Sequence, residues 1–227
     1  MNLILFDCDG TIVDSQHIIV AAMERAFTAN GLPVPGRAGI LSVVGLSLVP
    51  AVTRLLPADT DPVLAQRLAE AYKQGFQGLR GDPAHHEPLY PGARETITAL
   101  AARDDCVLGI ATGKSRRGVD VLLEREGFHG LFATIQTADD HPSKPHPSMI
   151  LKALAETGAQ PAQAVMIGDT TYDMEMARAA GVAALGVAWG YHDALALNAA
   201  GARMVIGHYG ELPRAVDGCL PGQGAAA

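Results

Sequence analysis

The chain has 227 residues, of which 48% are hydrophobic and 18% are charged, and its formal net charge is −7. These values exclude a disordered chain and are typical of one substantial core, or of a core domain with a smaller inserted domain. Nucleic-acid binding requires a surplus of positive charge to neutralise phosphates, so the acidic balance argues against such a partner.

Hydropathy and cysteine usage exclude two further classes. No apolar stretch reaches the ~18–20 residues needed to cross a bilayer, and no signal peptide precedes the first expected strand. We therefore expect a cytoplasmic protein without a membrane partner, either a monomer or a homodimer. Cys8, Cys106 and Cys219 are too few and too scattered for a disulfide framework or a zinc site.

The chain opens on an apolar run, residues 2–6, that ends in Asp7-Cys8-Asp9-Gly10-Thr11. Residues i and i+2 of a strand point to the same side, so Asp7 and Asp9 are expected to face one site, with Cys8 turned away into packing. Two carboxylates ~4–5 Å apart repel by about 3–4 kcal/mol at an effective dielectric near ~20. A cation, a proton or both must offset that repulsion.

A helical stretch follows the first strand. Asp14 or Ser15 can cap a helix that ends at Gly31, and further helices are expected near Ser47 and from Asp61 to about Leu79. The buried face of the first helix is predicted to consist of Ile18, Ile19, Ala22, Met23, Ala26 and Phe27. We therefore expect residues 15–83 to form an all-helical insertion, and residues 1–14 and 84–227 to form an α/β core.

From about Tyr90 onward, strands and helices alternate, which predicts a doubly wound parallel sheet covered on both faces. The expected strands are residues 106–111, 133–136, 164–167, 183–188 and 203–206. The expected helices start at Ala93, Ser115, Pro147 and Asp193, with another through residues 174–180. The glycine-rich tail, residues 218–227, is expected to be frayed.

Chemistry-bearing residues follow three of the apolar strands. The first ends in Asp7 and Asp9, the second in Thr112-Gly113, and the third in Gly168-Asp169 with Asp173 further on, while the loop 143–147 presents Lys144. Parallel strands bring these ends to one edge of the sheet. Together they supply a nucleophile, a proton shuttle, a hydroxyl donor, a cation and a metal-binding acid, which are the requirements of phosphoryl transfer.

These motifs resemble those of the haloacid dehalogenase superfamily, and within it the phosphoglycolate-phosphatase-like branch with a helical cap. The matching residues are Asp7-Cys8-Asp9-Gly10-Thr11, Thr112-Gly113, Lys144-Pro145 and Gly168-Asp169-Thr170-Thr171-Tyr172-Asp173. The resemblance extends to about Leu212. It implies a Rossmann-like core and a Mg²⁺-dependent phosphatase that acts on a small phosphorylated substrate, such as phosphoglycolate or a sugar phosphate.

The resemblance also implies a role for each motif residue. Asp7 would be the nucleophile that forms an aspartyl-phosphate, and Asp9 the general acid and base. Thr112 and the Gly113 amide would hold phosphate oxygens, and Lys144 would neutralise charge. The metal ligands would be Asp7, Asp169 and the backbone carbonyl of Asp9, with Asp173 orienting a metal-bound water or Lys144.

Substrate choice is expected to reside in the insertion, where Gly45, Ser47, Arg54 and Lys73 are candidates. Both Arg54 and Lys73 could equally be surface charges. Lys114, Arg116 and Arg117 crowd a helix start, where cations are disfavoured; this hints at an anion nearby, but a solvated surface is the favoured interpretation.

Three alternatives remain open. A sugar-phosphate mutase would keep both acids and Mg²⁺, although the resemblance makes Thr11 more usual in a phosphatase. A P-loop nucleotide hydrolase is disfavoured because only three residues separate Gly109 from Gly113, where that loop needs four. A non-catalytic binding homologue is disfavoured because every motif residue is intact.

Overall fold

In a computed structural model describing residues 1–220, six strands form an all-parallel sheet in the order β3-β2-β1-β4-β5-β6. The strands are β1 (Asn2–Phe6), β2 (Cys106–Thr112), β3 (Phe132–Thr137), β4 (Ala164–Gly168), β5 (Ala183–Val187) and β6 (Met204–Ile206). The strand order reverses at β1 and β4, which lie side by side in the centre. This arrangement confirms the predicted parallel sheet.

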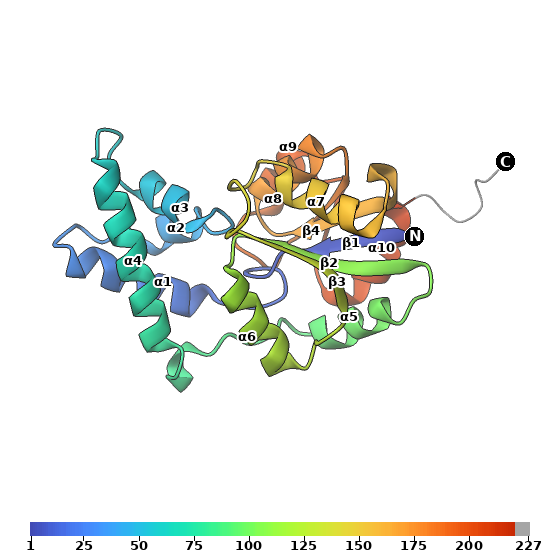
Figure 1. Ribbon diagram of the computed structural model, residues 1–227, viewed down its shortest axis with the longest axis horizontal. Helices are drawn as coiled ribbons and strands as arrows, with labels where there is room; N and C mark the ends of the chain where they lie inside the picture. Colours follow the sequence, from blue (N-terminus) through green and yellow to red (C-terminus); the bar gives the residue numbers. More distant parts are fainter. Residues whose placement is uncertain (221–227) are drawn as a thin grey trace.

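Helices cover both faces of the sheet (Figure 1). One face carries α5 (Ala93–Ala101), α6 (Arg116–Glu126) and α10 (Leu212–Cys219), and the other carries α7 (Ser148–Thr157), α8 (Thr171–Ala179) and α9 (Ala194–Ala200). The side chains of β1 alternate between the two layers: Ile4 and Phe6 pack in the first, and Leu3 and Leu5 in the second. The continuous apolar run of β1 is thus explained by burial on both faces.

Four helices inserted between β1 and β2 form a separate lobe, seen at the left of Figure 1, which we call the cap. They are α1 (Gln16–Ala29), α2 (Arg37–Leu41), α3 (Leu48–Leu55) and α4 (Pro62–Leu79). All six residues predicted for the apolar face of α1 are buried. The short helix α2 was not expected from the sequence; it contributes one buried side chain, Ile40, which gives too weak a periodic signal for detection.

The two chain segments that join the cap to the core lie side by side. The backbone N–H of Asp14 donates to the carbonyl of Pro88 (2.8 Å), and that of Tyr90 donates to the carbonyl of Ile12 (3.0 Å). The chain thus passes between cap and core near residues 12–14 and again near residues 88–90. Short 3₁₀ helices occur at η1 (Pro83–His85), η2 (Pro161–Gln163) and η3 (Tyr209–Glu211).

The C-terminal expectation needs a correction. Gly218 and Cys219 were placed in a frayed tail, but they belong to α10, where the buried Cys219 side chain packs against the core. Residues 221–227, the rest of that expected tail, lie outside the described residues.

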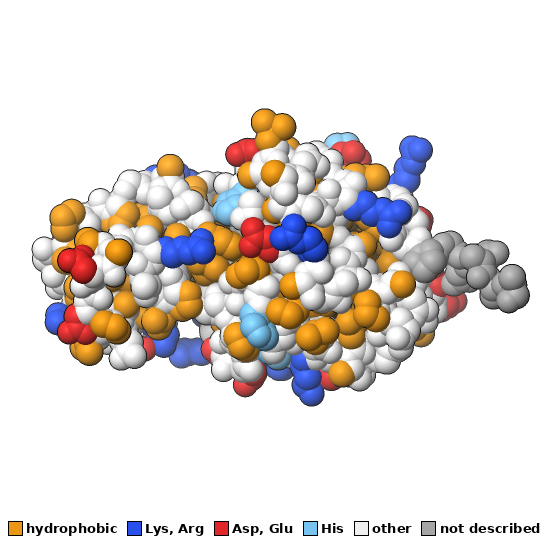
Figure 2. Space-filling view, turned by 90° about the horizontal axis from the view of Figure 1, so that it is seen from above, with side chains coloured by type: hydrophobic (Ala, Val, Ile, Leu, Met, Phe, Trp, Pro, Cys, Tyr) orange, Lys and Arg blue, Asp and Glu red, His pale blue; other side chains and the backbone are white. Residues whose placement is uncertain are grey.

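Two features of the structure are consistent with the hydropathy and charge of the sequence. Among residues 1–220, no helix is both long and apolar enough to cross a membrane. On the face shown in Figure 2, acidic and basic side chains are interspersed with hydrophobic ones rather than gathered by sign.

Candidate active site

The candidate site lies where the strand order of the sheet reverses. Asp7 directly follows β1, Asp169 directly follows β4, and these two strands are hydrogen-bonded neighbours. Crevices at the carboxyl ends of strands at such a switch point are where open α/β sheets bind ligands. The predicted meeting of these strand ends is therefore observed.

Asp7 is almost fully buried, with 1% of its surface exposed. Its Oδ1 accepts a hydrogen bond from the Cys8 N–H (2.7 Å), and its Oδ2 lies 3.1 Å from Lys144 Nζ. Burial raises the pKa of Asp7 to about 6, against the opposing effect of the Lys144 charge. Cys8 packs in the core as predicted, and burial raises the pKa of its thiol, so it is inert.

Lys144 is a buried cation between two carboxylates. Its Nζ lies 2.6 Å from Asp173 Oδ1 as well as near Asp7, and its side chain is fully buried. Burial alone would lower the pKa of Lys144, but the Asp173 and Asp7 carboxylates raise it overall, so the ammonium stays charged. Asp173 is itself anchored, because its Oδ2 accepts from the Thr170 hydroxyl (2.7 Å) and N–H (3.1 Å).

Asp169 sits in a close-fitting backbone cradle. Its Oδ1 accepts from the Thr11 hydroxyl (2.8 Å), and its Oδ2 accepts from the Tyr191 N–H (2.9 Å). A Cβ on Gly10 or Gly190 would lie 2.2 or 2.1 Å from this side chain, and Gly10 also has a φ of +84°. Only glycine meets both requirements at position 10, which explains the Asp-Gly-Thr order of the first motif.

The donor set fits a hard divalent cation. Asp7, Asp169 and Asp173 are buried, and each offers a carboxylate oxygen within 4.8 Å of the others. Lys144 offsets only one of the three negative charges, and burial together with the neighbouring Asp173 and Asp7 raises the pKa of Asp169 well above its usual range. All-oxygen ligands at this charge are the set that Mg²⁺ prefers. Asp173, expected outside the ligand set, thus lies within the carboxylate cluster while also holding Lys144.

The carboxylate of Asp9 has different partners. Its Oδ1 accepts from the Ser15 hydroxyl (2.6 Å) and lies 2.7 Å from Lys114 Nζ. Asp7 and Asp9 both line one cavity, as strand alternation predicts, but they are not equivalent there. Asp7 belongs to the carboxylate cluster, whereas Asp9 belongs to a second ion-pair network closer to the cap.

Lys114 is not the solvated surface lysine that was expected from the sequence. Its side chain is 8% exposed and pairs with Asp9 and with Glu87 (3.1 Å), which is 6% exposed. Burial would lower the pKa of Lys114, but the Asp9 and Glu87 carboxylates raise it overall. Glu87 lies 27 residues before Lys114 in the chain, and nothing in its local sequence indicated this pairing. The cations at the start of α6, which indicated an anion nearby, were the sequence feature that pointed to a buried acidic partner.

The β2 strand ends at Thr112, and Gly113 opens the loop after it; these are the two residues expected to bind phosphate. Thr112 is buried, lines the cavity, and accepts a hydrogen bond from the Lys114 N–H (3.2 Å). The following helix, α6, starts at Arg116 with Ser115 as its cap, as predicted, because the Ser115 hydroxyl accepts from the Gly118 N–H. Gly113 lies directly under the cap: a Cβ there would stand 2.6 Å from the Gly45 carbonyl oxygen.

Three of the four candidate cap residues, Gly45, Ser47 and Lys73, line the cavity. The Ser47 N–H also donates to the Ser143 hydroxyl (2.9 Å), next to Lys144. Arg54 is directed elsewhere, because α3 turns its guanidinium onto the core residue Tyr172, to whose hydroxyl it donates (2.8 Å). Arg54 therefore joins cap to core rather than facing the cavity.

The fold and the site together define a doubly wound α/β protein whose buried carboxylate cluster lies at the switch point of the sheet. A family model described as haloacid dehalogenase-like hydrolase matches residues 4–187, and the chain belongs to this family. A probable phosphatase, IndB, from Dickeya dadantii is 35% identical over 222 residues, covering 96% of this chain and 94% of the relative.

Two further relatives agree with this assignment. A phosphoglycolate phosphatase from Pseudomonas putida is 30% identical over 213 residues, covering 90% of this chain and 76% of that protein. The crystal structure of a hydrolase from Pseudomonas syringae matches with a TM-score of 0.85 at 27% identity, covering 97% of this chain and all of that one (100%). The overall fold, including the cap, is thus shared along nearly the whole chain.

Proposed function

We propose that this protein is a Mg²⁺-dependent phosphatase that hydrolyses a small phosphomonoester through an aspartyl-phosphate on Asp7. The observation that carries the proposal is the position of the Asp7 carboxylate. Asp7 lines the cavity together with Thr112 and Asp9, and its Oδ2 lies 3.1 Å from Lys144 Nζ with no other hydrogen-bond partner among the described residues. An attacking oxygen needs a lone pair that no other hydrogen-bond donor occupies.

In the first step, Asp7 Oδ2 attacks the phosphorus, and the bond from phosphorus to the ester oxygen breaks. Thr112 and the Gly113 N–H hold the phosphate oxygens, and Lys144 neutralises the charge that gathers on them. Asp9 delivers a proton to the leaving oxygen, so the alcohol departs neutral.

In the second step, Asp9 takes a proton from water, and the resulting oxygen attacks the phosphorus of the aspartyl-phosphate. The bond from phosphorus to Asp7 Oδ2 breaks, which returns the carboxylate and releases inorganic phosphate. Lys114 and Ser15 hold the Asp9 carboxylate at the edge of the cavity, where one group can serve both steps.

Asp7, Asp169 and the backbone carbonyl of Asp9 would hold Mg²⁺, and Asp173 would support the cluster while anchoring Lys144. When bound, the ion supplies charge neutralisation between the nucleophile and the phosphoryl oxygens. We further propose that residues 15–83, the cap, select the substrate, and that residues 1–14 and 84–227 carry out the chemistry.

The test is phosphate release from a panel of phosphomonoesters with Mg²⁺ or EDTA, using wild type, Asp7→Asn and, as a control, Asp120→Asn on the exposed surface of α6. We expect activity with Mg²⁺ alone, and its loss in Asp7→Asn but not in the control. Activity that persists in EDTA, or that survives Asp7→Asn, would contradict the proposal. Trapping of a phosphorylated Asp7 in a single turnover tests the intermediate directly.

The mutase alternative is tested by its product. Sugar 1-phosphates are incubated with the protein and Mg²⁺, and both free phosphate and isomerised sugar phosphate are measured. Isomer formed without free phosphate would reverse the choice between hydrolase and mutase.

A further inference from the structure

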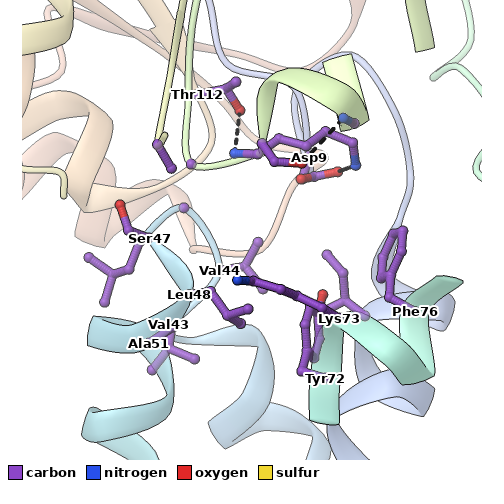
Figure 3. Close-up of a pocket in the computed structure, with 18 of the residues that line it drawn as sticks. Asp9, Val43, Val44, Ser47, Leu48, Ala51, Tyr72, Lys73, Phe76 and Thr112 are labelled. Carbon is purple, nitrogen blue, oxygen red and sulfur yellow. Dashed lines mark hydrogen bonds and ion pairs between the residues drawn. The ribbon is translucent and has the colours of Figure 1, made fainter. Parts of the chain in front are cut away.

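The cavity in front of Asp7 and Asp9 has two chemically different sides. Asp9, Thr112 and Lys114 line it from the core, and cap helices line it from the opposite side (Figure 3). The cap side is an apolar wall, formed chiefly by Ile19, Met23, Ile40, Val44, Leu48 and Phe76. Four of these side chains, Ile19, Met23, Ile40 and Val44, also belong to the hydrophobic core of the cap, so the wall is held in place by packing.

The cavity encloses about 550 Å³. Cavities of ~300–1,000 Å³ enclose drug-sized ligands, whereas glycolate adds only two carbons to the phosphate. This volume belongs to a cap that is already seated on the core: the Ser47 N–H donates to Ser143, and Tyr172 is bonded to both Arg54 and the Ser42 carbonyl. Gly45 moreover lies against Gly113, so the loop next to the phosphate site has little room to move closer.

Cations line the same cavity beside the apolar wall. Lys73 and Arg117 are exposed, and Lys73 pairs with Glu70 (2.7 Å). Arg80 lies with its guanidinium carbon 5.4 Å from the centre of the Phe76 ring, and its buried Nε has no hydrogen-bond partner among residues 1–220. Arg80 is therefore the group that would select a carboxylate, and the test must separate that selection from apolar binding.

We propose that this site prefers phosphomonoesters whose organic group is apolar and at least as large as a six-carbon chain or ring, over short esters such as phosphoglycolate. The preference rests on the proposed phosphatase function and concerns the same site. Its physical basis is that methylene groups set against the apolar wall gain free energy from leaving water, and only a long chain or a ring fills the cavity.

The test is a ladder of n-alkyl phosphates, from ethyl to hexyl, with kcat/KM measured from phosphate release. Burial of each methylene is expected to raise kcat/KM about 3- to 4-fold. Phosphoglycolate is compared with hexyl phosphate, and hexyl phosphate is expected to be the better substrate because its chain reaches the apolar wall. A flat ladder, or phosphoglycolate preferred by tenfold or more, would overturn the proposal and point to Arg80.

A pair of variants tests whether the dependence of kcat/KM on chain length comes from the apolar wall. Leu48→Asn places an amide of similar size in the cavity, and Leu195→Asn makes the same change on α9, where the side chain is 82% exposed. We expect Leu48→Asn to lower kcat/KM for hexyl phosphate about tenfold but for ethyl phosphate less than about twofold, because only the longer chain reaches apolar wall. Leu195→Asn should leave the whole ladder unchanged. An unchanged ladder in Leu48→Asn would overturn the assignment of the wall.

Binding of n-alkylphosphonates, which have no ester bond to cleave, gives a second ladder by calorimetry. A rising phosphonate ladder without phosphate release from any ester would refute the phosphatase while supporting the apolar preference. A flat phosphonate ladder together with normal phosphate release would refute the preference and leave the phosphatase standing.

Discussion

Lys114 Nζ lies 2.7 Å from Asp9 Oδ1, and the same ammonium lies 3.1 Å from Glu87 Oε1. The general-acid candidate is thus held by a buried ion-pair network separate from the carboxylate cluster around Lys144. The two buried lysines divide the site, since one faces the nucleophile candidate and the other faces the proton-transfer candidate.

Removal of the Lys114 charge should destabilise the protein, because Glu87 would remain buried without its ion-pair partner. For Lys114→Met we expect a loss of about 3–5 kcal/mol in the free energy of unfolding, measured by urea denaturation. The exposed pair of Lys152 and Glu156 on α7 provides the control, for which Lys152→Met should cost less than about 1 kcal/mol. Adding Glu87→Gln to Lys114→Met should restore part of the loss. Equal stability of Lys114→Met and wild type would contradict the buried pairing.

The Thr112 hydroxyl should matter to phosphate binding, since Thr112 lines the cavity beside Asp7. Thr112→Val is expected to lower kcat/KM about 10- to 100-fold, the range for loss of one hydrogen bond to a charged group. Thr112→Ser, which keeps the hydroxyl, should retain most activity. If Thr112→Val and Thr112→Ser behave alike, the hydroxyl does not contact phosphate.

Metal binding should depend on pH through Asp7, whose pKa of about 6 lies above its ordinary value of 3.8. Without metal, the folded protein retains a proton at Asp7 that the unfolded chain loses. The stability contributed by this proton is therefore fully present below pH 3.8 and is lost as the pH rises through about 6.

Because Mg²⁺ competes with this proton, its affinity should fall about tenfold for each pH unit below 6. Calorimetric titration at about pH 7.5 and about pH 5 checks this expectation. The Asp7→Asn variant should bind more weakly and with a smaller pH dependence. Equal affinity at both pH values in wild type would show that Asp7 is not a ligand.

Substitution by alanine should impair activity at Gly113 but increase the stability of the protein at Gly218. Gly113→Ala would push the Gly45 carbonyl away from the phosphate-binding loop, since the added Cβ stands 2.6 Å from it, and kcat/KM should fall at least tenfold. Gly218→Ala adds a methyl to α10 in open space, and should stabilise the protein by about 0.5–1 kcal/mol. Phosphate release and urea denaturation are measured on both variants. Full activity in Gly113→Ala would show that the seated cap loop is not needed.

The sequence by itself determined the sheet and the order of its motifs. Continuous apolar strands such as residues 2–6 can be buried on both faces only within a parallel sheet, and parallel strands must bring Asp7, Thr112 and Asp169 to one edge. Ser115 was predicted to cap a helix from local backbone chemistry, and it does so at the start of α6. Features of this kind depend on neighbours within a few residues or on strand periodicity.

Only the tertiary structure decided which charges are buried and what the cavity presents to a substrate. From the sequence, Lys114 was expected at the solvated surface, but it is buried in an ion pair with Glu87. Arg54 was a candidate for substrate binding, but its guanidinium donates to the Tyr172 hydroxyl instead. The apolar wall likewise arises where four cap helices and the loop after α2 meet. The physical reason is that burial and ion pairing depend on contacts between segments distant in the chain, whereas strand and cap signals are local.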